Sequence, residues 1–259
     1  GQQVIALTRF GGYAEYVVAD QRAIAEVPAN IDAAAATGLA TQYTTAYYAT
    51  HELVNIFPGD VVLVHAAAGG VGSGILQMCL LKGATVIATA GSDEKINWLK
   101  SMGATYTVNY RKQDYVEEIK KWGLHQKVDI VFDSIAGSNI GKGFKMLNAG
   151  GRLVMYGVSK LSESTNPLIV LKNALSFGIY HPAEFMMSSK SILAVNMLNI
   201  ADHKPEIIQR CMQASVAYYA SGKIDVPHTK VVPLSALAEM HAALENRSTM
   251  GKIAVMWNE

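Results

Sequence analysis

A glycine-rich turn between a short apolar run and a helix-like run constrains the fold of this chain most. Residues 65–72 read His-Ala-Ala-Ala-Gly-Gly-Val-Gly, directly after the apolar run Val61–Val64. Glycines at such a turn permit a tight bend and close backbone approach to a pyrophosphate, and the following helix N-terminus supplies amide donors. Ala67 stands where the usual fingerprint has its first glycine. The segment predicts dinucleotide binding, although tight packing alone also produces glycine-rich turns.

Short apolar runs alternate with helix-like segments between about Pro58 and Tyr180, which is the pattern of βαβ units. Several runs are wholly apolar or β-branched, as expected for parallel strands covered on both faces. The sequence therefore predicts an α/β fold with a doubly wound parallel (Rossmann) sheet. The expected strands are Val61–His65, Thr85–Ala90, Thr105–Asn109, Val128–Asp133, Arg152–Tyr156 and Ser176–Tyr180. The expected helices are Gly70–Lys82, Asp93–Ser101, Asp114–Trp122 and Asn139–Leu147, the last ended by the residues 148–151.

The two ends of the chain show a different pattern from the middle. Val4–Leu7 and Tyr13–Ala19, joined through a Gly-Gly pair, are predicted to form antiparallel strands. Two further helices, Pro205–Ser221 and Leu234–Glu245, and a last strand, Lys252–Trp257, are expected downstream. The ends could therefore fold together as a second domain.

Composition excludes several classes of function. The chain has 259 residues and a formal net charge of +1, which argues against a nucleic-acid partner because phosphate binding requires a concentrated basic surface. Its two cysteines, Cys79 and Cys211, lie far apart and can form neither a disulfide framework nor a cysteine-rich zinc site. No apolar run approaches the roughly 18 residues of a transmembrane helix. We predict a cytoplasmic protein.

The end of the second predicted strand indicates which dinucleotide binds. In an NAD site an acidic residue roughly 20 positions after the glycines binds the ribose 2′-hydroxyl. Here the strand ends Thr-Ala-Gly-Ser at Ser92, and Lys95 follows one turn later. A small donor and a cation suit a 2′-phosphate, so NADPH is predicted. The alternative is that Ser92 only caps a helix and Lys95 is only solvated. Asp93 is expected to point away from the site.

Several short segments give the chain a resemblance to a known family. They are Gly11–Tyr16, Thr45–Tyr47, Ala66–Gly72, Asn109–Arg111, Phe132–Ser134 and Gly251–Ile253. Together they resemble the zinc-free medium-chain dehydrogenases/reductases, within these the zeta-crystallin-like quinone oxidoreductases and their vesicle amine transport protein-like relatives. The resemblance runs along the whole chain.

The resemblance implies a GroES-like, β-rich catalytic domain divided between the two ends of the chain. It places the rest of an N-terminal catalytic domain at residues 1–35, an NADPH-binding Rossmann domain at 36–181 and a return to the catalytic domain at 182–259. It also implies a homodimer joined through the last Rossmann strand. Roughly a quarter more chain is expected to precede Gly1, consistent with one small subdomain.

The resemblance further implies roles for individual residues. Gly69, Gly70, Val71 and Gly72 would contact the pyrophosphate, and Ser92, Lys95 and Tyr110 would surround the 2′-phosphate. Thr45 and Ser134 would lie near the nicotinamide, Gly157 would lie against the cofactor, and Arg247 would close over it. Two of these residues also have an interpretation without a cofactor role: Tyr110 as an aromatic residue that packs at a strand end, and Arg247 as a solvated charge.

No metal site is expected. The zinc-dependent relatives carry a cysteine-rich lobe between the first two strands, where this chain has only a short glycine-containing link. Neither cysteine has a partner at ligand spacing. His65 is predicted to be a packed or capped histidine at a strand end.

The predicted function is zinc-free hydride transfer from NADPH to a quinone or an α,β-unsaturated carbonyl substrate. Charge that develops on the substrate oxygen would need hydrogen-bond donors, for which Tyr43 and Tyr47 are weak candidates because aromatic residues on apolar segments are more often core. Two alternatives stay open: an enoyl reductase module of a multidomain polyketide or fatty acid synthase, and an NADPH-binding structural or interaction protein without turnover. No motif selects the small-molecule substrate.

Overall fold

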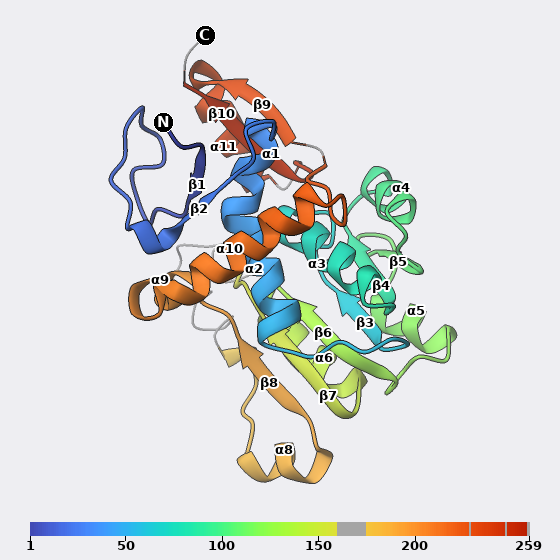
Figure 1. Ribbon diagram of the computed structural model, residues 1–259. Helices are drawn as coiled ribbons and strands as arrows, with labels where there is room; N and C mark the ends of the chain where they lie inside the picture. The colour runs from blue at the N-terminus through green and yellow to red at the C-terminus, as the bar shows by residue number, and fades with distance from the viewer. Residues whose placement is uncertain (160–174, 228, 247, 258–259) are drawn as a thin grey trace. The chain divides into compact units, whose positions relative to one another are not determined.

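The computed structural model describes residues 1–159, 175–227, 229–246 and 248–257 (Figure 1). Two compact units can be distinguished. One contains Gly1–Tyr48, Gly69–Ile75 and Asn196–Glu259, and the other contains Ala49–Ala68 and Leu76–Val195. We call them the outer unit and the sheet unit and describe each by itself.

The sheet unit is built on six parallel strands in the order β5-β4-β3-β6-β7-β8. From the central β3 the chain adds β4 and β5 on one side and then β6, β7 and β8 on the other. This arrangement confirms the predicted doubly wound sheet. The strands are β3 (Val61–Val64), β4 (Thr85–Ala90), β5 (Tyr106–Asn109), β6 (Val128–Asp133), β7 (Leu147–Met155) and β8 (Ser191–Ala194).

Four helices connect these strands where the sequence predicted them, within one or two residues. They are α3 (Gly70–Leu81), α4 (Asp93–Ser101), α5 (Tyr115–Lys121) and α6 (Ser138–Met146). Local capping explains two of the starts. The side chains of Ser92 and Asp114 accept hydrogen bonds from the first-turn amides of α4 and α5.

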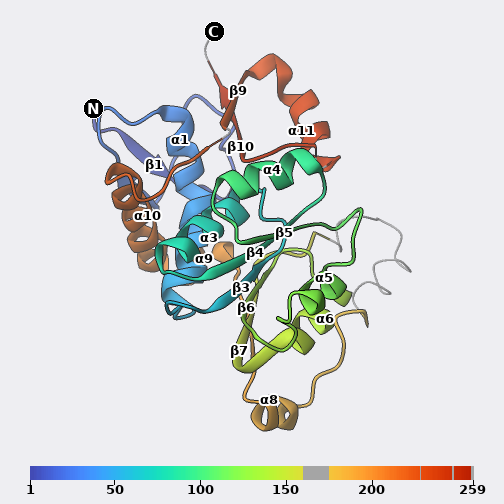
Figure 2. The same cartoon turned by 90° about the vertical axis from the view of Figure 1, so that its right-hand side faces the viewer.

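A single cross-strand row of side chains forms the core on one face of the sheet. Parallel register places Ile87, Leu63, Val131 and Leu153 side by side on neighbouring strands. All four are fully buried in one cluster with Ile119 of α5 and Phe144 of α6. Helices α5 and α6 lie together on this face (Figure 2). The core therefore holds the carboxyl ends of β3, β4 and β6 in a common edge.

The prediction for the last strand of the sheet was wrong. Residues 176–180 form no strand; the sixth strand is β8, which follows α8 (Pro182–Ser188). Tyr180 instead packs its ring against Phe144, with centroids 5.5 Å apart. The apolar character of this segment therefore serves side-chain packing without backbone pairing. β7 also begins earlier than predicted, at Leu147, so residues 148–151 belong to the strand rather than to a helix stop.

The outer unit begins with an antiparallel pair that differs from the predicted one. β1 (Val4–Ala6) pairs with β2 (Ile24–Glu26), and residues 13–19 form no strand. The pairing buries Ile5 and Ala25, whereas Tyr16 is 90% and Val18 98% exposed. The residues 13–19 contain β-forming side chains but have no buried face to place them on, so the more distant segment pairs instead.

The rest of the outer unit is mainly helical. The predicted helices near 205 and 234 and the last strand are confirmed, and β10 pairs in parallel with a strand that the sequence did not reveal, β9. No helix in the described ranges is long and apolar enough to cross a membrane. The elements are the 3-10 turn Gln21–Ala23, α1 (Ala33–Gly38), the π-helical turn Leu39–Tyr43, α2 (Thr44–Tyr47), the π-helical turn Tyr48–Glu52 that leads to the sheet unit, α9 (Met197–His203), α10 (Pro205–Ala220), β9 (Thr229–Pro233), the 3-10 turn Leu234–Ala236, α11 (Leu237–Glu245) and β10 (Lys252–Met256).

Candidate functional site

The glycine-rich turn leads directly from β3 into α3. Ala66 has a positive φ of 49°, and the amide of Ala67 donates to the carbonyl of Thr89 at the end of β4, 3.0 Å away. The amide of Ser73 donates to Gly69 O at 2.8 Å. Ala67 is fully buried, so this alanine fits between β3 and β4 where the fingerprint has a glycine.

Gly70, the first residue of α3, lies under a side chain that sequence reasoning missed. A Cβ atom at Gly70 would stand 2.1 Å from Cδ of Gln42, which belongs to the π-helical turn before α2. A Cβ atom at Gly74 would stand 2.9 Å from that of Ala46. Both glycines therefore permit close packing of α3. No local pattern around Gln42 announces this contact, because it depends on tertiary packing.

The turn after β4 collects the residues predicted for the 2′-phosphate. Ser92 Oγ accepts a hydrogen bond from the amide of Lys95 at 3.3 Å, so Ser92 does cap α4. A Cβ atom at the neighbouring Gly91 would lie 2.6 Å from the hydroxyl oxygen of Tyr110, which is 39% exposed. The hydroxyls of Ser92 and Tyr110 and the amide of Lys95 thus lie close to Gly91.

Asp93, the acidic residue nearest to this turn, is bound elsewhere. Asn109 Nδ2 donates to its Oδ1 at 2.8 Å, and the Lys112 ammonium pairs with its Oδ2. Lys112 and then Asn109 hold the pKa of Asp93 below its usual range. The carboxylate is therefore stabilised in its charged form by partners other than Lys95.

The turn after β6 is organised by a buried carboxylate. Asp133 is fully buried, and its Oδ1 accepts the amides of Ile135 at 2.7 Å and Ala136 at 2.6 Å. These bonds support two successive residues of positive φ, Ala136 at 67° and Gly137 at 62°. Sequence reasoning missed this role of Asp133. Its signal was local: an aspartate followed within four residues by glycine is typical of a turn.

Ser134 and Gly157, both predicted near the cofactor, are brought together at this turn. A Cβ atom at Gly157 would lie 2.9 Å from the carbonyl oxygen of Ser134 and 3.1 Å from its Cβ. The amide of Tyr156 donates to Asp133 O at 2.9 Å, which continues the pairing of β6 and β7. Only glycine fits at position 157.

His65 is buried and contacts the ends of β4, β6 and β7, and it is the packed histidine that the sequence predicted. Its Nδ1 lies 3.1 Å from Thr89 Oγ1, and its Nε2 lies 4.0 Å from Asp133 Oδ2. Its carbonyl accepts the Tyr156 hydroxyl at 3.1 Å. Burial lowers the pKa of His65, although the Asp133 charge opposes that effect. The neutral imidazole therefore dominates near neutral pH.

The remaining predicted residues lie in the outer unit. Thr45 is buried and its hydroxyl donates to Thr41 O at 2.7 Å. The ring of Tyr43 is buried and its hydroxyl donates to Asp225 O at 2.6 Å, which favours the packing interpretation of that residue. The ring of Tyr47 lies edge-on to Tyr218 at 5.6 Å between centroids. Arg247 lies outside the described residues.

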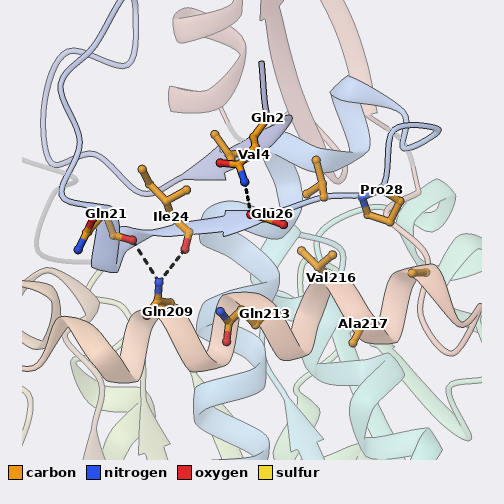
Figure 3. Close-up of a pocket in the computed structure, with 12 residues that line it drawn as sticks. Gln2, Val4, Gln21, Ile24, Glu26, Pro28, Gln209, Gln213, Val216 and Ala217 are labelled. Atoms are coloured by element: carbon orange, nitrogen blue, oxygen red, sulfur yellow. Dashed lines mark hydrogen bonds between the residues drawn. The ribbon is translucent and has the colours of Figure 1, made fainter.

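Two cavities of the outer unit contain none of the predicted cofactor residues. Figure 3 shows the larger, a groove of about 950 Å³ between the β1–β2 pair and α10. There Gln209 Nε2 donates to the carbonyls of Gln21 and Ile24 at 3.1 and 3.3 Å. The second, about 600 Å³, lies against β1 and α1 and includes Thr41. Among the described residues no three His, Cys, Asp or Glu side chains gather as a metal site.

Comparisons with known proteins agree with this arrangement of strands and turns. The family profile described as "Zinc-binding dehydrogenase" matches residues 70–212, which is more than half of the chain. The chain belongs to the medium-chain dehydrogenases/reductases. Within this family its relatives place it in the zeta-crystallin-like, quinone oxidoreductase-like group, as the sequence predicted.

Three members of this family illustrate the similarity. The chain is 31% identical over 263 residues to the synaptic vesicle membrane protein VAT-1 homolog of Rattus norvegicus, covering 99% of this chain and 63% of that protein. A solved quinone oxidoreductase of Escherichia coli, complexed with NADPH, shares 24% identity with a TM-score of 0.81 and covers 99% of this chain and 76% of its own. The CurK enoyl reductase shares 26% identity with a TM-score of 0.74, covering 90% of this chain and 65% of that one.

Proposed function

We propose that this medium-chain dehydrogenase/reductase transfers hydride from NADPH to a quinone or an α,β-unsaturated carbonyl compound without zinc. The turn after β4 carries this proposal: Lys95, Ser92 and Tyr110 meet around Gly91, while Asp93 is bound by Lys112 and Asn109. A cation with a neutralised acid beside it favours a 2′-phosphate over a 2′-hydroxyl. Family membership and the NADPH-bound Escherichia coli relative support the same cofactor.

The described residues fit such a cofactor. A Cβ atom at Gly91 or at Gly157 would lie within 3.0 Å of a neighbouring atom, so glycine keeps both turns narrow. NADPH would supply the hydride from its nicotinamide ring. Ser92, Lys95 and Tyr110 would bind the 2′-phosphate, and the turn Gly69–Gly72 would present amides to the pyrophosphate.

At the nicotinamide end the chain would hold the nicotinamide ring in place through a backbone turn of defined shape. Asp133 braces the turn that carries Ser134, and Gly157 packs on that turn, so the backbone there has one defined shape. Thr45 is assigned to the same end from the family resemblance. Hydrogen-bond donors to the substrate oxygen would stabilise its developing charge.

The test is NADPH consumption by the natural full-length protein, followed by absorbance, with benzoquinone and a simple enone as substrates. Turnover with NADPH and much weaker turnover with NADH is the expected result. Gly72→Val should abolish binding of both cofactors, because a branched side chain would block close approach to the helix. Unchanged cofactor affinity in this variant would contradict a pyrophosphate role for the turn.

Two other functions have support. The CurK similarity favours an enoyl reductase acting on a carrier-bound acyl chain; in that case a crotonyl thioester should be reduced faster than benzoquinone. An NADPH-binding structural or interaction protein without turnover, the alternative that the family resemblance leaves open, predicts tight NADPH binding with no consumption on either substrate. A homodimer through the last Rossmann strand, here β8, and a cytoplasmic location stay predictions.

A further inference from the structure

Arg111 follows Tyr110 at the end of β5 and has no role in the site described so far. Parallel register pairs Ala90 with Asn109, and the amide of Tyr110 donates to Ala90 O at 3.1 Å. The backbone then turns, with the amide of Arg111 donating to Asn109 Oδ1 at 3.1 Å. Arg111 therefore leaves the sheet beside the end of β4, where the predicted 2′-phosphate residues meet.

The side chain of Arg111 turns toward this meeting point. A Cβ atom at Gly91 would lie 3.4 Å from Arg111 Nε, in addition to its contact with the Tyr110 hydroxyl. The Nε end of the Arg111 side chain thus lies over the backbone of Gly91. Lys95 lies in the first turn of α4, where its amide donates to Ser92 Oγ next to Gly91.

Two positive charges are consequently held close together. Burial lowers the pKa of Lys95, the charge of Arg111 lowers it further, and the charge of Glu94 opposes both effects. In the part of the chain that the structure describes, no carboxylate forms an ion pair with the Arg111 guanidinium, whereas the neighbouring Lys112 is paired with Asp93. Like charges at close range repel unless an anion lies with them, so this pair favours an anionic ligand.

We propose that Arg111 binds the 2′-phosphate of NADPH together with Lys95, so that the phosphate lies between the guanidinium and the ammonium. The planar guanidinium offers paired N–H donors that match phosphate oxygens, while the ammonium acts as a point charge. This assignment rests on the proposed NADPH function and makes Arg111 a determinant of cofactor specificity. Lys112, one position later, serves a different purpose by neutralising Asp93.

The experiment measures the dissociation constants of NADPH and NADH by calorimetry for the natural full-length protein and for three variants. Arg111→Ala should weaken NADPH binding by about tenfold to a hundredfold and leave NADH within about twofold, because the lost contact is a charge-assisted hydrogen bond to the phosphate alone. Arg111→Lys should fall between, since it keeps the charge without the paired donors. Lys100→Ala, which removes an exposed cation from the last turn of α4, is the matched control and should change neither constant.

Each outcome separates this inference from the function on which it rests. Arg111→Ala that leaves the NADPH constant unchanged, or weakens both cofactors equally, would overturn the role of Arg111 while a wild-type preference for NADPH still stands. Loss of NADPH affinity in Lys100→Ala as well would overturn it too, because net charge would then explain the effect. A wild-type protein that binds neither cofactor would sink the proposed function itself. Far-ultraviolet circular dichroism establishes that each variant is folded.

Discussion

The turns that follow β4 and β6 lie at the same edge of one sheet but use charge in opposite ways. After β4, Arg111 is exposed and Lys95 is half-buried, and the side chains of Tyr110 and Arg111 lie over Gly91. After β6, the carboxylate of Asp133 is fully buried and accepts two backbone amides. The first turn carries a cation at the protein surface, whereas the second uses its buried carboxylate to define backbone shape.

This difference follows from solvation. A buried carboxylate needs hydrogen bonds to replace its lost water, and Asp133 Oδ1 obtains two from its own turn. Asp133 Oδ2 accepts none from the described residues and lies 4.0 Å from His65 Nε2. An exposed cation such as Arg111 keeps its water and can exchange it for a phosphate. We therefore expect substitutions after β6 to change stability and substitutions after β4 to change cofactor affinity.

The largest expected effect is on stability, from Asp133→Ala. Removing this carboxylate leaves the amides of Ile135 and Ala136 without an acceptor, and should lower the free energy of unfolding by about 2–4 kcal/mol. Asp133→Asn keeps an acceptor oxygen and should cost less. Urea denaturation measures both. Equal losses in the two variants would show that the hydrogen bonds to the turn are not the reason for the buried carboxylate.

The next largest effect is on affinity, from Lys95→Ala. Loss of a charge-assisted contact should weaken NADPH binding by about 1.5–3 kcal/mol and spare NADH. Calorimetry with both cofactors measures this, and the unfolding free energy should hardly change. Lys100→Ala serves as the control on the same helix. If both cofactors were weakened alike, Lys95 would not read the 2′-phosphate.

Alanine at the two glycines compares the turns directly. At Gly157 the new methyl would meet the backbone carbonyl of Ser134 at 2.9 Å, which cannot move aside, so stability should fall by about 1–3 kcal/mol. At Gly91 it would meet the ends of the Tyr110 and Arg111 side chains, which can rotate away. Gly91→Ala should therefore cost less stability but weaken NADPH binding. If thermal melting showed the larger stability loss for Gly91→Ala, and calorimetry the larger loss of NADPH affinity for Gly157→Ala, the two turns would not differ in the way described.

The smallest expected effect is a pH dependence from His65. Because burial lowers its pKa in the folded chain, the unfolded chain takes up a proton first as the pH falls below about 6.5. Stability should then decrease with falling pH, by at most about 1.4 kcal/mol per pH unit. His65→Gln should remove this part of the slope. An identical slope in the variant, measured by urea denaturation between about pH 7 and 5.5, would exclude His65 as its source.

Local patterns in the sequence were sufficient for most of the sheet unit. Five of the six strands and the helices α3, α4, α5 and α6 were predicted, because buried parallel strands are continuous apolar runs and helices carry their own caps. Helix α8, between β7 and β8, was not predicted. The glycine turn, Ser92 and Lys95 were also predictable, since they follow strand ends in sequence, whereas Tyr110 was assigned only from the family resemblance. What the residues themselves could not supply was the family and the roles of Ser134 and Gly157, which came from the resemblance.

Tertiary structure alone decided the features that depend on distant partners. Ser191–Ala194 became the last strand instead of residues 176–180, and Ile24–Glu26 replaced residues 13–19 beside β1, because pairing requires a free edge and a face to bury. Gln42 over Gly70, and Arg111 beside Lys95, likewise arise from segments far apart in sequence. The sequence by itself determined which elements form, since their causes are local; which side chains meet was settled by packing, since its causes are not.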